Sequence, residues 1–173
     1  MGCGRGEFLK LLKEHEIPAR GVDPERSMVA VCQKQRIGVI LGDALKYLRT
    51  LPNDSLIGAT AFQVVEHLPT GYLIEFVKAA RTKTASEEII ILETVNSNSL
   101  ARLMNFYLDF THKNPIPSQT LKFLVEAAGY REVSVLYSSP IPDNLKLQGS
   151  DDNTQKLNRL LFGPQDYAVI GKK

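Results

Sequence analysis

The sequence predicts an α/β fold, a doubly wound and mostly parallel sheet with helices on both faces and an antiparallel edge near the C-terminus. Three observations support this prediction. Short apolar runs rich in β-branched residues alternate with amphipathic segments of helical length. Several of these runs end at a turn that carries an acidic or polar side chain. A glycine-rich turn near the N-terminus leads straight into a helix. Such alternation is typical of parallel strands joined by helical crossovers.

The expected elements follow one another at regular spacing. Helices are expected over residues 7–16, 25–34, 45–51, 70–83, 98–107, 118–129 and 155–162, and strands over residues 19–22, 37–41, 56–65, 89–92, 131–138 and 166–170. The unbroken apolar run at 89–92 predicts a central strand that is covered on both faces. Ser118 is the expected N-cap of its helix. The last two strands are too close together for a helical crossover, which favours antiparallel pairing.

Length and composition limit the possible functions. With 173 residues, of which 43% are hydrophobic and 23% charged, the chain suits one globular domain spanning residues 1–173. A formal net charge of +2 gives no electrostatic reason to expect a nucleic acid, so we expect a small-molecule or glycan substrate. The two cysteines, Cys3 and Cys32, predict free thiols and a reducing, cytoplasmic location. No segment approaches the roughly 18 apolar residues of a membrane span, so no membrane insertion is expected.

The glycine-rich turn Gly2-Cys3-Gly4-Arg5-Gly6 has the chemistry of a cofactor-binding loop. Glycines at alternate positions allow positive φ and a close approach of the backbone to a ligand. The free N–H groups at the start of the following helix favour electronegative atoms. In open α/β sheets, such a loop lies at the carboxyl end of a strand, in the crevice where ligands bind.

Two cofactors compete for this loop, a nicotinamide dinucleotide and S-adenosylmethionine. The dinucleotide fingerprint needs a third glycine at residue 7, and this residue is Glu7. Its negative charge repels a pyrophosphate and suits a ligand with an ammonium group, a sulfonium and one ribose. Asp23, after the next strand, could accept charge-assisted hydrogen bonds from both ribose hydroxyls. Asp43 repeats that position one strand later and could accept from the adenine amino group, while the Ala44 N–H donates to the ring.

In this order, the motifs resemble those of the class I S-adenosylmethionine-dependent methyltransferases, over nearly the whole chain. The resemblance implies a Rossmann-like fold and S-adenosylmethionine as the cofactor. The matching segments are Gly2-Cys3-Gly4-Arg5-Gly6 as the first motif, Gly21-Val22-Asp23 as the ribose site, Gly42-Asp43-Ala44 as the adenine site and Phe62-Gln63-Val64-Val65-Glu66-His67-Leu68 as the fourth motif. The cofactor-binding residues that the resemblance implies are Gly2, Cys3, Gly4, Gly6, Asp23, Asp43, Ala44 and Gln63.

A narrower resemblance concerns the second half of the chain. The segments Glu93-Thr94-Val95-Asn96, Asp109-Phe110-Thr111-His112 and Pro115-Ile116-Pro117 look like those of bacterial methyltransferases associated with glycosyltransferases and surface-polysaccharide synthesis. In the ubiquinone-type O-methyltransferases, a related branch, two glutamates and a histidine of the fourth motif bind a divalent metal. Here Gln63 stands at the first glutamate position. Because an amide oxygen is a poorer ligand for a hard cation, we expect no metal.

The family also has a hydrophobic strand before the first glycine, together with helices that cover the substrate. In this sequence Met1 stands where the last residue of that strand is expected. We therefore expect an N-terminally truncated methyltransferase domain that lacks its first strand. Its neighbouring strands would be left with unpaired backbone groups, and the exposed sheet would allow oligomers to form.

Two histidines are the candidates for catalysis. A hydroxyl acceptor loses a proton when it is methylated, and an imidazole can take that proton near neutral pH. His67 follows the fourth-motif strand, and its alternative role is to cap the next helix or to bond Glu66. His112 lies in a proline-bounded loop, where it acts as a base, contacts the substrate or only orders the loop. Glu66 either orients His67, contacts the amino group of the cofactor or stabilises a helix N-terminus.

The sequence thus predicts an enzyme, an S-adenosylmethionine-dependent methyltransferase that acts on a hydroxyl or phosphate oxygen of a sugar or another small metabolite. The alternative from a different class is a non-catalytic fragment or pseudoenzyme that keeps the outline of the cofactor crevice. A third alternative, a dinucleotide-dependent oxidoreductase, fails if Glu7 stands at the start of the helix.

Overall fold

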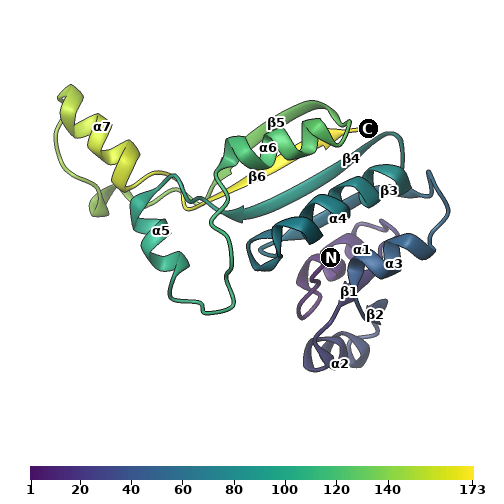
Figure 1. The fold of residues 1–173 in the computed structure, drawn as a ribbon. Helices are drawn as coiled ribbons and strands as arrows, with labels where there is room; N and C mark the ends of the chain where they lie inside the picture. Colours follow the sequence, from purple (N-terminus) through teal and green to yellow (C-terminus); the bar gives the residue numbers. More distant parts are fainter.

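The computed structural model describes all residues from 1 to 173 and has the α/β architecture that the sequence predicts (Figure 1). The helices are α1 (Glu7–Glu14), α2 (Arg26–Lys34), α3 (Ala44–Thr50), α4 (Thr70–Lys83), α5 (Leu100–Phe106), α6 (Ser118–Ala127) and α7 (Asp152–Leu161), with 3₁₀ turns η1 (Val65–His67) and η2 (Asp143–Leu145). The strands are β1 (Gly21–Asp23), β2 (Val39–Leu41), β3 (Leu56–Phe62), β4 (Thr84–Val95), β5 (Arg131–Ser138) and β6 (Asp166–Lys172).

The strands form a small sheet and a large sheet. β1 and β2 pair in parallel, and the four-stranded sheet has the order β3-β4-β6-β5. β3 and β4 are parallel, whereas β6 is antiparallel to both of its neighbours. The antiparallel pairing of the last two strands is therefore confirmed. The antiparallel strand itself, β6, lies inside the sheet, and β5 forms the edge.

The first two residues of the chain connect the two sheets. The Gly2 N–H donates a hydrogen bond to the Val22 carbonyl of β1 (2.9 Å), and the Met1 nitrogen donates to the Thr60 carbonyl of β3 (2.7 Å). β1 and β3 are not paired with each other, so each has one edge without a strand partner.

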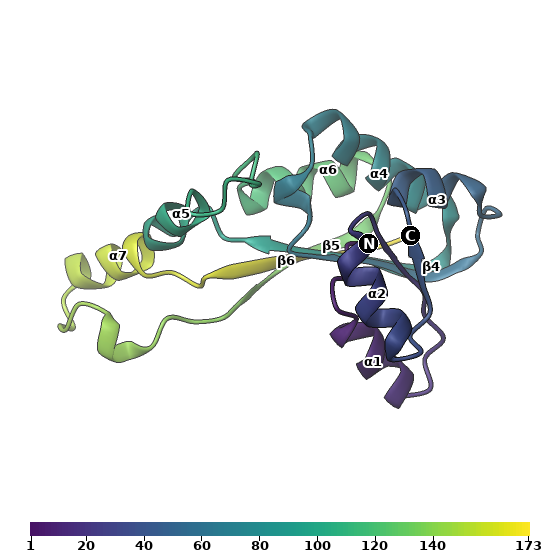
Figure 2. The same ribbon diagram turned by 90° about the horizontal axis from the view of Figure 1, so that it is seen from below.

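The helices cover the two faces of the large sheet unequally. α4 and α6 pack on one face, and α3 lies beside α4 (Figure 2). On the other face, Phe8 of α1 packs edge-on against Phe62 of β3, with the ring centroids 4.9 Å apart. No helix lies along the rest of that face (Figure 2). Ile90 of β4 is fully buried, whereas Ile89 is 37% exposed and Leu136 of β5 is 58% exposed. The expectation that β4 is covered on both faces is therefore wrong.

Several element boundaries differ from the expected ones. β3 ends at Phe62, because Gln63 adopts a left-handed conformation with φ of 51° and turns the chain toward η1. β4 runs over twelve residues, far more than its apolar core suggests. The N-cap of α6 is Pro117, not Ser118. The Ser118 hydroxyl is instead hydrogen-bonded to the Tyr137 hydroxyl (2.8 Å), which fixes α6 against β5.

Helices α5 and α7 lie together at the end of the molecule remote from the N-terminus (Figure 1). This end exposes large apolar side chains, among them Met104 of α5 (73% exposed), Leu160 of α7 (52%) and Phe110 in the loop after α5 (100%). Among the helices, none combines the length and the apolar character that a bilayer crossing needs.

Candidate active site

The glycine-rich loop has the conformation that its glycines predict. Gly2, Gly4 and Gly6 have φ of 60°, 52° and 83°, a region that strongly favours glycine. The Gly6 N–H donates to the Cys3 carbonyl (2.9 Å) and closes the turn. Helix α1 then begins at Glu7, with Gly6 as its N-cap. Because Glu7 stands at the start of the helix, the dinucleotide-dependent oxidoreductase fails as an alternative.

The loop packs tightly against its surroundings. A Cβ atom at Gly2 would lie 2.4 Å from Cγ2 of Val64, so the loop lies directly against the residues that follow β3. The Cys32 thiol of α2 donates to the Gly4 carbonyl (3.3 Å). Both cysteines are free thiols, as expected. Burial, followed by the neighbouring Cys32, raises the pKa of Cys3 to about 11, so Cys3 is an uncharged packing group in this loop.

Asp23 fixes the loop from the end of β1. It is only 6% exposed, and its two carboxylate oxygens accept hydrogen bonds from the N–H groups of Gly4 and Glu25, both 2.9 Å long. Each oxygen keeps a further lone pair, as binding of the ribose hydroxyls requires. The structure therefore brings Asp23 to the predicted first motif, and its role as ribose ligand stays a prediction.

Asp43 is the N-cap of α3 and lies one strand further along. One of its oxygens accepts from the Lys46 N–H (2.7 Å), and the other accepts from the Tyr72 hydroxyl of α4 (2.9 Å). The backbone N–H of Gly42 donates to the Asp23 carbonyl (2.9 Å), which places the two acidic strand ends side by side. Ala44 is the first residue of α3, so its N–H has no acceptor within the helix and is free for a ligand. The adenine roles of Asp43 and Ala44 stay predictions.

Gln63 points away from the glycine-rich loop. Its amide nitrogen donates to Glu93 of β4 (3.2 Å) and to Asp166 of β6 (3.3 Å). The side chain thus belongs to a polar group at the carboxyl ends of β3 and β4, which also includes Arg102 of α5, 3.3 Å from Asp166. No contact in the structure ties Gln63 to the other predicted cofactor residues, and its part in cofactor binding stays a prediction.

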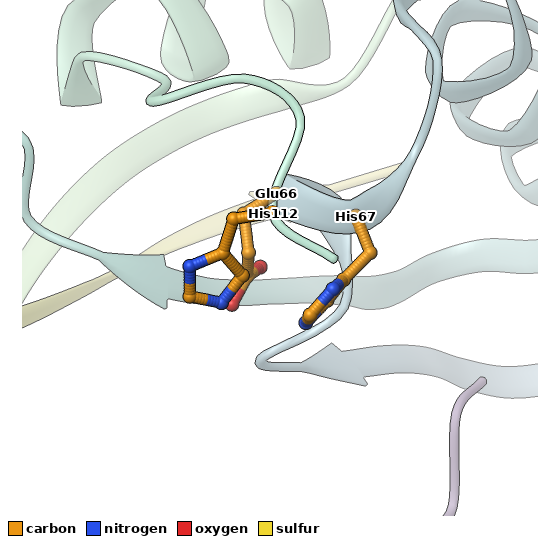
Figure 3. Close-up of side chains that lie close together, drawn as sticks. All are labelled: Glu66, His67 and His112. Atoms are coloured by element: carbon orange, nitrogen blue, oxygen red, sulfur yellow. The ribbon is translucent and has the colours of Figure 1, made fainter. Parts of the chain in front are cut away.

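The two candidate catalytic histidines, expected from separate segments, lie next to each other. The ring centroids of His67 in η1 and His112 in the loop before α6 are 4.6 Å apart. Together with Glu66 they form a cluster in which one possible ligand atom of each residue lies within 4.8 Å of the other two. Figure 3 shows the three side chains projecting on the same side of the backbone segments that carry them. We call these three residues the Glu66 cluster.

Backbone hydrogen bonds hold the loop of His112 against η1. The N–H groups of Lys113 and Asn114 both donate to the Glu66 carbonyl (2.9 and 3.2 Å), and the Asn114 side chain donates to the Leu68 carbonyl (3.1 Å). The His112 ring lies over the buried Phe106 ring, with the centroids 4.5 Å apart. The predicted loop after α5 is therefore an ordered part of the site.

Glu66 is buried below the two imidazoles, with 1% of its surface exposed. Its Oε2 accepts a hydrogen bond from the Thr94 hydroxyl of β4 (2.7 Å), whereas its Oε1 has no hydrogen-bond partner. The Glu66 carboxylate makes no hydrogen bond to His67, so the suggestion that it orients this histidine is wrong. Burial, followed by the charge of Glu66, raises the pKa of the nearby Tyr167.

Each imidazole is oriented by a hydrogen bond at Nδ1. Nδ1 of His112 lies 2.7 Å from the Phe106 carbonyl oxygen, which can only accept, so Nδ1 carries the proton. Nδ1 of His67 lies 3.0 Å from the Thr111 hydroxyl. That hydroxyl donates its one hydrogen to Asp109 (2.6 Å), so it must accept from His67. In the neutral imidazoles, the lone pair is therefore on Nε2 of both rings.

Thr94, Asp109 and Thr111 are further parts of the site, although the sequence motifs include them only within longer segments and assign them no role. The Thr111 N–H donates to Asp109 (2.8 Å), a local turn that the segment Asp109-Phe110-Thr111 makes recognisable. The Thr111 hydroxyl and N–H lower the pKa of Asp109. Asp109 also lies 3.8 Å from Nε2 of His112. Thr94 contacts Glu66 only because β4 runs beside β3, which no local pattern shows.

The comparisons with known proteins agree with this arrangement. A family model described as a methyltransferase domain matches residues 1–135. A solved S-adenosylmethionine-dependent methyltransferase from Archaeoglobus fulgidus is 40% identical, with a TM-score of 0.96, and the match covers 99% of this chain and 83% of that one. No curated protein matches the chain.

More distant solved structures share the fold. One is an S-adenosylmethionine-dependent methyltransferase from Thermotoga maritima, described as a possible histamine N-methyltransferase, with 18% identity, a TM-score of 0.75 and coverage of 100% of this chain and 79% of that chain. Another is a phosphoethanolamine N-methyltransferase from Haemonchus contortus in complex with S-adenosylhomocysteine, with 12% identity, a TM-score of 0.72 and coverage of 99% and 47%. Together with the loop and the acidic strand ends, the family match shows that the chain belongs to the S-adenosylmethionine-dependent methyltransferases of class I.

Proposed function

We propose that the chain transfers the methyl group of S-adenosylmethionine to an oxygen of a sugar or another small metabolite, and that this oxygen belongs to a hydroxyl group. The observation that carries the proposal is the pair of imidazoles in the Glu66 cluster. Both rings offer an unprotonated Nε2, and the cluster follows β3 at the carboxyl end of that strand. A hydroxyl needs such a base, whereas a phosphate oxygen is already ionised.

The reaction that follows is an in-line displacement at the methyl carbon. The acceptor oxygen forms a bond to this carbon while the carbon–sulfur bond breaks, and S-adenosylhomocysteine leaves. The hydroxyl proton passes to Nε2 of His67 or His112. The protein contributes mainly by placing donor and acceptor in line and by holding a base within hydrogen-bond distance of the acceptor hydroxyl.

Two further observations support a small polar acceptor. The segments around Asp109 and Pro115 resemble those of methyltransferases of surface-polysaccharide synthesis. The formal net charge of +2 offers no strong field for a polyanionic substrate. A monosaccharide or a short glycan is therefore the acceptor that we propose to test first.

The test is methyl transfer from S-adenosylmethionine that carries an isotopic label in its methyl group. The acceptor panel contains monosaccharides with free hydroxyls, sugar phosphates and simple amines. We expect label on a hydroxyl, and we expect His67→Asn or His112→Asn to lower kcat by about 100-fold or more, the contribution typical of a general base. His15→Asn is the matched control, because His15 is an exposed residue at the C-terminal end of α1.

Different failures of this test have different meanings. Label found only on amines would contradict an oxygen acceptor. Unchanged kcat in both histidine variants would remove the base from the mechanism. Binding of S-adenosylmethionine in a calorimeter without turnover on any acceptor would support the non-catalytic alternative.

A further inference from the structure

We propose that the Glu66 cluster binds one divalent transition-metal ion, of the class to which Zn²⁺ belongs, through Glu66, His67 and His112. Binding itself follows from the geometry of the three side chains. The use of the ion in catalysis, described below, rests on the proposed function. The expectation of no metal considered the ligands of the fourth motif alone. Glu66 and His67 belong to that motif, whereas the third ligand, His112, comes from outside it.

Three possible ligand atoms converge in the cluster. A carboxylate and two imidazoles each bring one possible ligand atom within 4.8 Å of the others. A tetrahedral zinc ion with bonds of about 2.0–2.1 Å needs its ligand atoms roughly 3.4 Å apart. The ligand atoms therefore have to approach one another by up to about 1.4 Å, which small rotations about the side-chain bonds can supply. Three protein ligands are the usual number in a catalytic zinc site.

Glu66 has an oxygen without a hydrogen-bond partner. Oε1 of Glu66 is buried and has no hydrogen-bond partner, and the residue as a whole is only 1% exposed. Leaving a buried charged oxygen unpaired is unfavourable, and such a group calls for an explanation. Oε2 is already held by Thr94, so the orientation of the carboxylate is fixed. A cation at the cluster would pair with Oε1 without disturbing this bond.

Both imidazoles have the orientation that a metal ligand needs. Metal-binding histidines usually donate their second N–H to a carbonyl or carboxylate, which fixes the tautomer and the ring. His112 donates from Nδ1 to the Phe106 carbonyl, and His67 donates to Thr111, which in turn is held by Asp109. Both rings therefore keep Nε2 free as a ligand atom. Thr111, Asp109 and the Phe106 carbonyl thus already hold the rings in the orientation that metal binding requires.

The ligand set selects the kind of ion. Two imidazoles and one carboxylate suit zinc and its neighbours, whereas magnesium prefers oxygen ligands. Gln63, the residue that would have to complete an oxygen-rich site, points to Glu93 and Asp166 instead. The Gln63 amide therefore supplies no oxygen ligand to the cluster, and the two imidazoles favour a softer ion.

An ion held by three protein ligands keeps a position open for a substrate oxygen. A hydroxyl bound there becomes more acidic, because the ion stabilises the oxygen anion. In the occupied site, Nε2 of both imidazoles is engaged by the ion, so the ion-bound hydroxyl releases its proton to solvent water. Proton transfer to Nε2 of His67 or His112, as in the proposed function, then belongs to the metal-free protein. The cluster would then fix the acceptor oxygen beside the methyl donor.

The experiment measures metal binding without any acceptor. The protein is treated with a chelator, dialysed and titrated in a calorimeter with Zn²⁺, and in parallel with Mg²⁺. Co²⁺ is added in a separate titration, because its visible absorption reports the number and geometry of its ligands. We expect one equivalent of Zn²⁺ or Co²⁺ to bind, and no comparable heat from Mg²⁺.

Variants of the ligands identify the site. Glu66→Gln keeps the shape of the side chain, and it should weaken Zn²⁺ binding by more than about 100-fold, because loss of an outer partner alone costs about 10–100-fold. Thr111→Val removes the partner of His67 at an exposed position, so the fold is not at risk, and a loss of about 10–100-fold is expected. His15→Asn should leave binding unchanged. Unaltered Zn²⁺ affinity in both Glu66→Gln and Thr111→Val, or no binding by the parent protein, would overturn the proposal.

Metal binding and methyl transfer, measured on the same protein, distinguish this proposal from the proposed function. If the ion binds and the variants lose it, but no hydroxyl is methylated, the metal site stands and the oxygen acceptor fails. If a hydroxyl is methylated at full rate while a chelator keeps the protein free of metal, the acceptor stands and the role of the ion fails. Binding of S-adenosylmethionine, measured separately, serves as the check that the cofactor crevice is intact.

Discussion

Asp23 has a double role at the cofactor crevice. Each of its two carboxylate oxygens accepts one backbone hydrogen bond, from the N–H of Gly4 or of Glu25, and the side chain is almost completely buried. The residue predicted to bind ribose is therefore also the residue that holds the glycine-rich loop in place. Loop conformation and ribose recognition depend on the same negative charge.

We predict that Asp23→Asn weakens S-adenosylmethionine binding by about tenfold or more. An amide can accept only one of the two N–H bonds, and its NH₂ group then faces the other donor, which leaves a charge-assisted hydrogen bond unmade at a cost of about 1.5–3 kcal/mol. Calorimetric titration with S-adenosylmethionine measures the change. The control is Glu25→Gln, which removes an exposed carboxylate two residues away. Equal affinities of the parent protein and Asp23→Asn would show that the charge has no part in binding.

Local residue patterns predict the cofactor crevice better than they predict the histidine pair. The alternating glycines, Asp23 and Asp43 are recognisable because each belongs to a local turn at a strand end. The contact between His67 and His112 is not, because it depends on where the loop of His112 meets η1. The position of that loop is set by the hydrogen bonds from the Lys113 and Asn114 N–H groups to the Glu66 carbonyl, which join residues far apart in the sequence.

At the scale of elements, β1 depends on a glycine that is not part of the glycine-rich loop. A Cβ atom at Gly21 would lie 2.6 Å from Leu9 Cδ1, 2.7 Å from Cys3 Sγ and 2.7 Å from Val39 Cγ2. These atoms belong to α1, the loop and β2, so this strand start is the point where all three meet. A side chain there would have to move three neighbours at once.

We predict that Gly21→Ala lowers the free energy of unfolding by about 1–3 kcal/mol, the usual cost of overpacking. Urea unfolding followed by circular dichroism gives the measurement. Gly71→Ala is the matched control, because nothing lies within 4 Å of the added atom in α4, and alanine should stabilise the helix by roughly 0.5 kcal/mol. A Gly21→Ala protein as stable as the control would mean that the three neighbours adjust freely.

The elements themselves are largely predictable from the sequence, whereas their neighbours in the sheet are not. The bounds of α4 and β5 agree with their apolar periodicity. The place of β6 between β4 and β5 depends on the chain returning from α7, which no local pattern contains. The apolar run predicts that β3 ends at Val65, because Val64 and Val65 continue it, whereas the strand ends at Phe62 and Gln63 already has a left-handed conformation.

At the scale of the whole molecule, the large sheet has an open face. Its apolar side chains include Ile89 of β4 and Leu136 of β5, which lie on the face that α4 and α6 do not cover. β1 and β3 add edges without strand partners. Exposed apolar faces and unpaired edges both favour contact with a second molecule.

We therefore predict concentration-dependent self-association, measured by sedimentation velocity over a range of protein concentrations. Leu136→Lys should shift the distribution toward the monomer, because it places a charge on the open face. Thr120→Lys, which places the same charge at an exposed polar position on α6, the helix on the opposite face of the sheet, is the matched control. A monomer at every concentration, with one sharp two-state melting transition, would contradict the prediction.

The hydrogen bond between Tyr72 and Asp43 has a spectroscopic consequence. The chain has no tryptophan, so its six tyrosines account for its intrinsic near-ultraviolet emission. The Tyr72 hydroxyl donates to Asp43, accepts from the Leu45 N–H (3.1 Å), and has a pKa raised by burial. The carboxylate predicted to receive adenine is thus bonded to a native fluorophore. A change in that bond alters tyrosine emission, and the protein carries its own optical reporter of the adenine site.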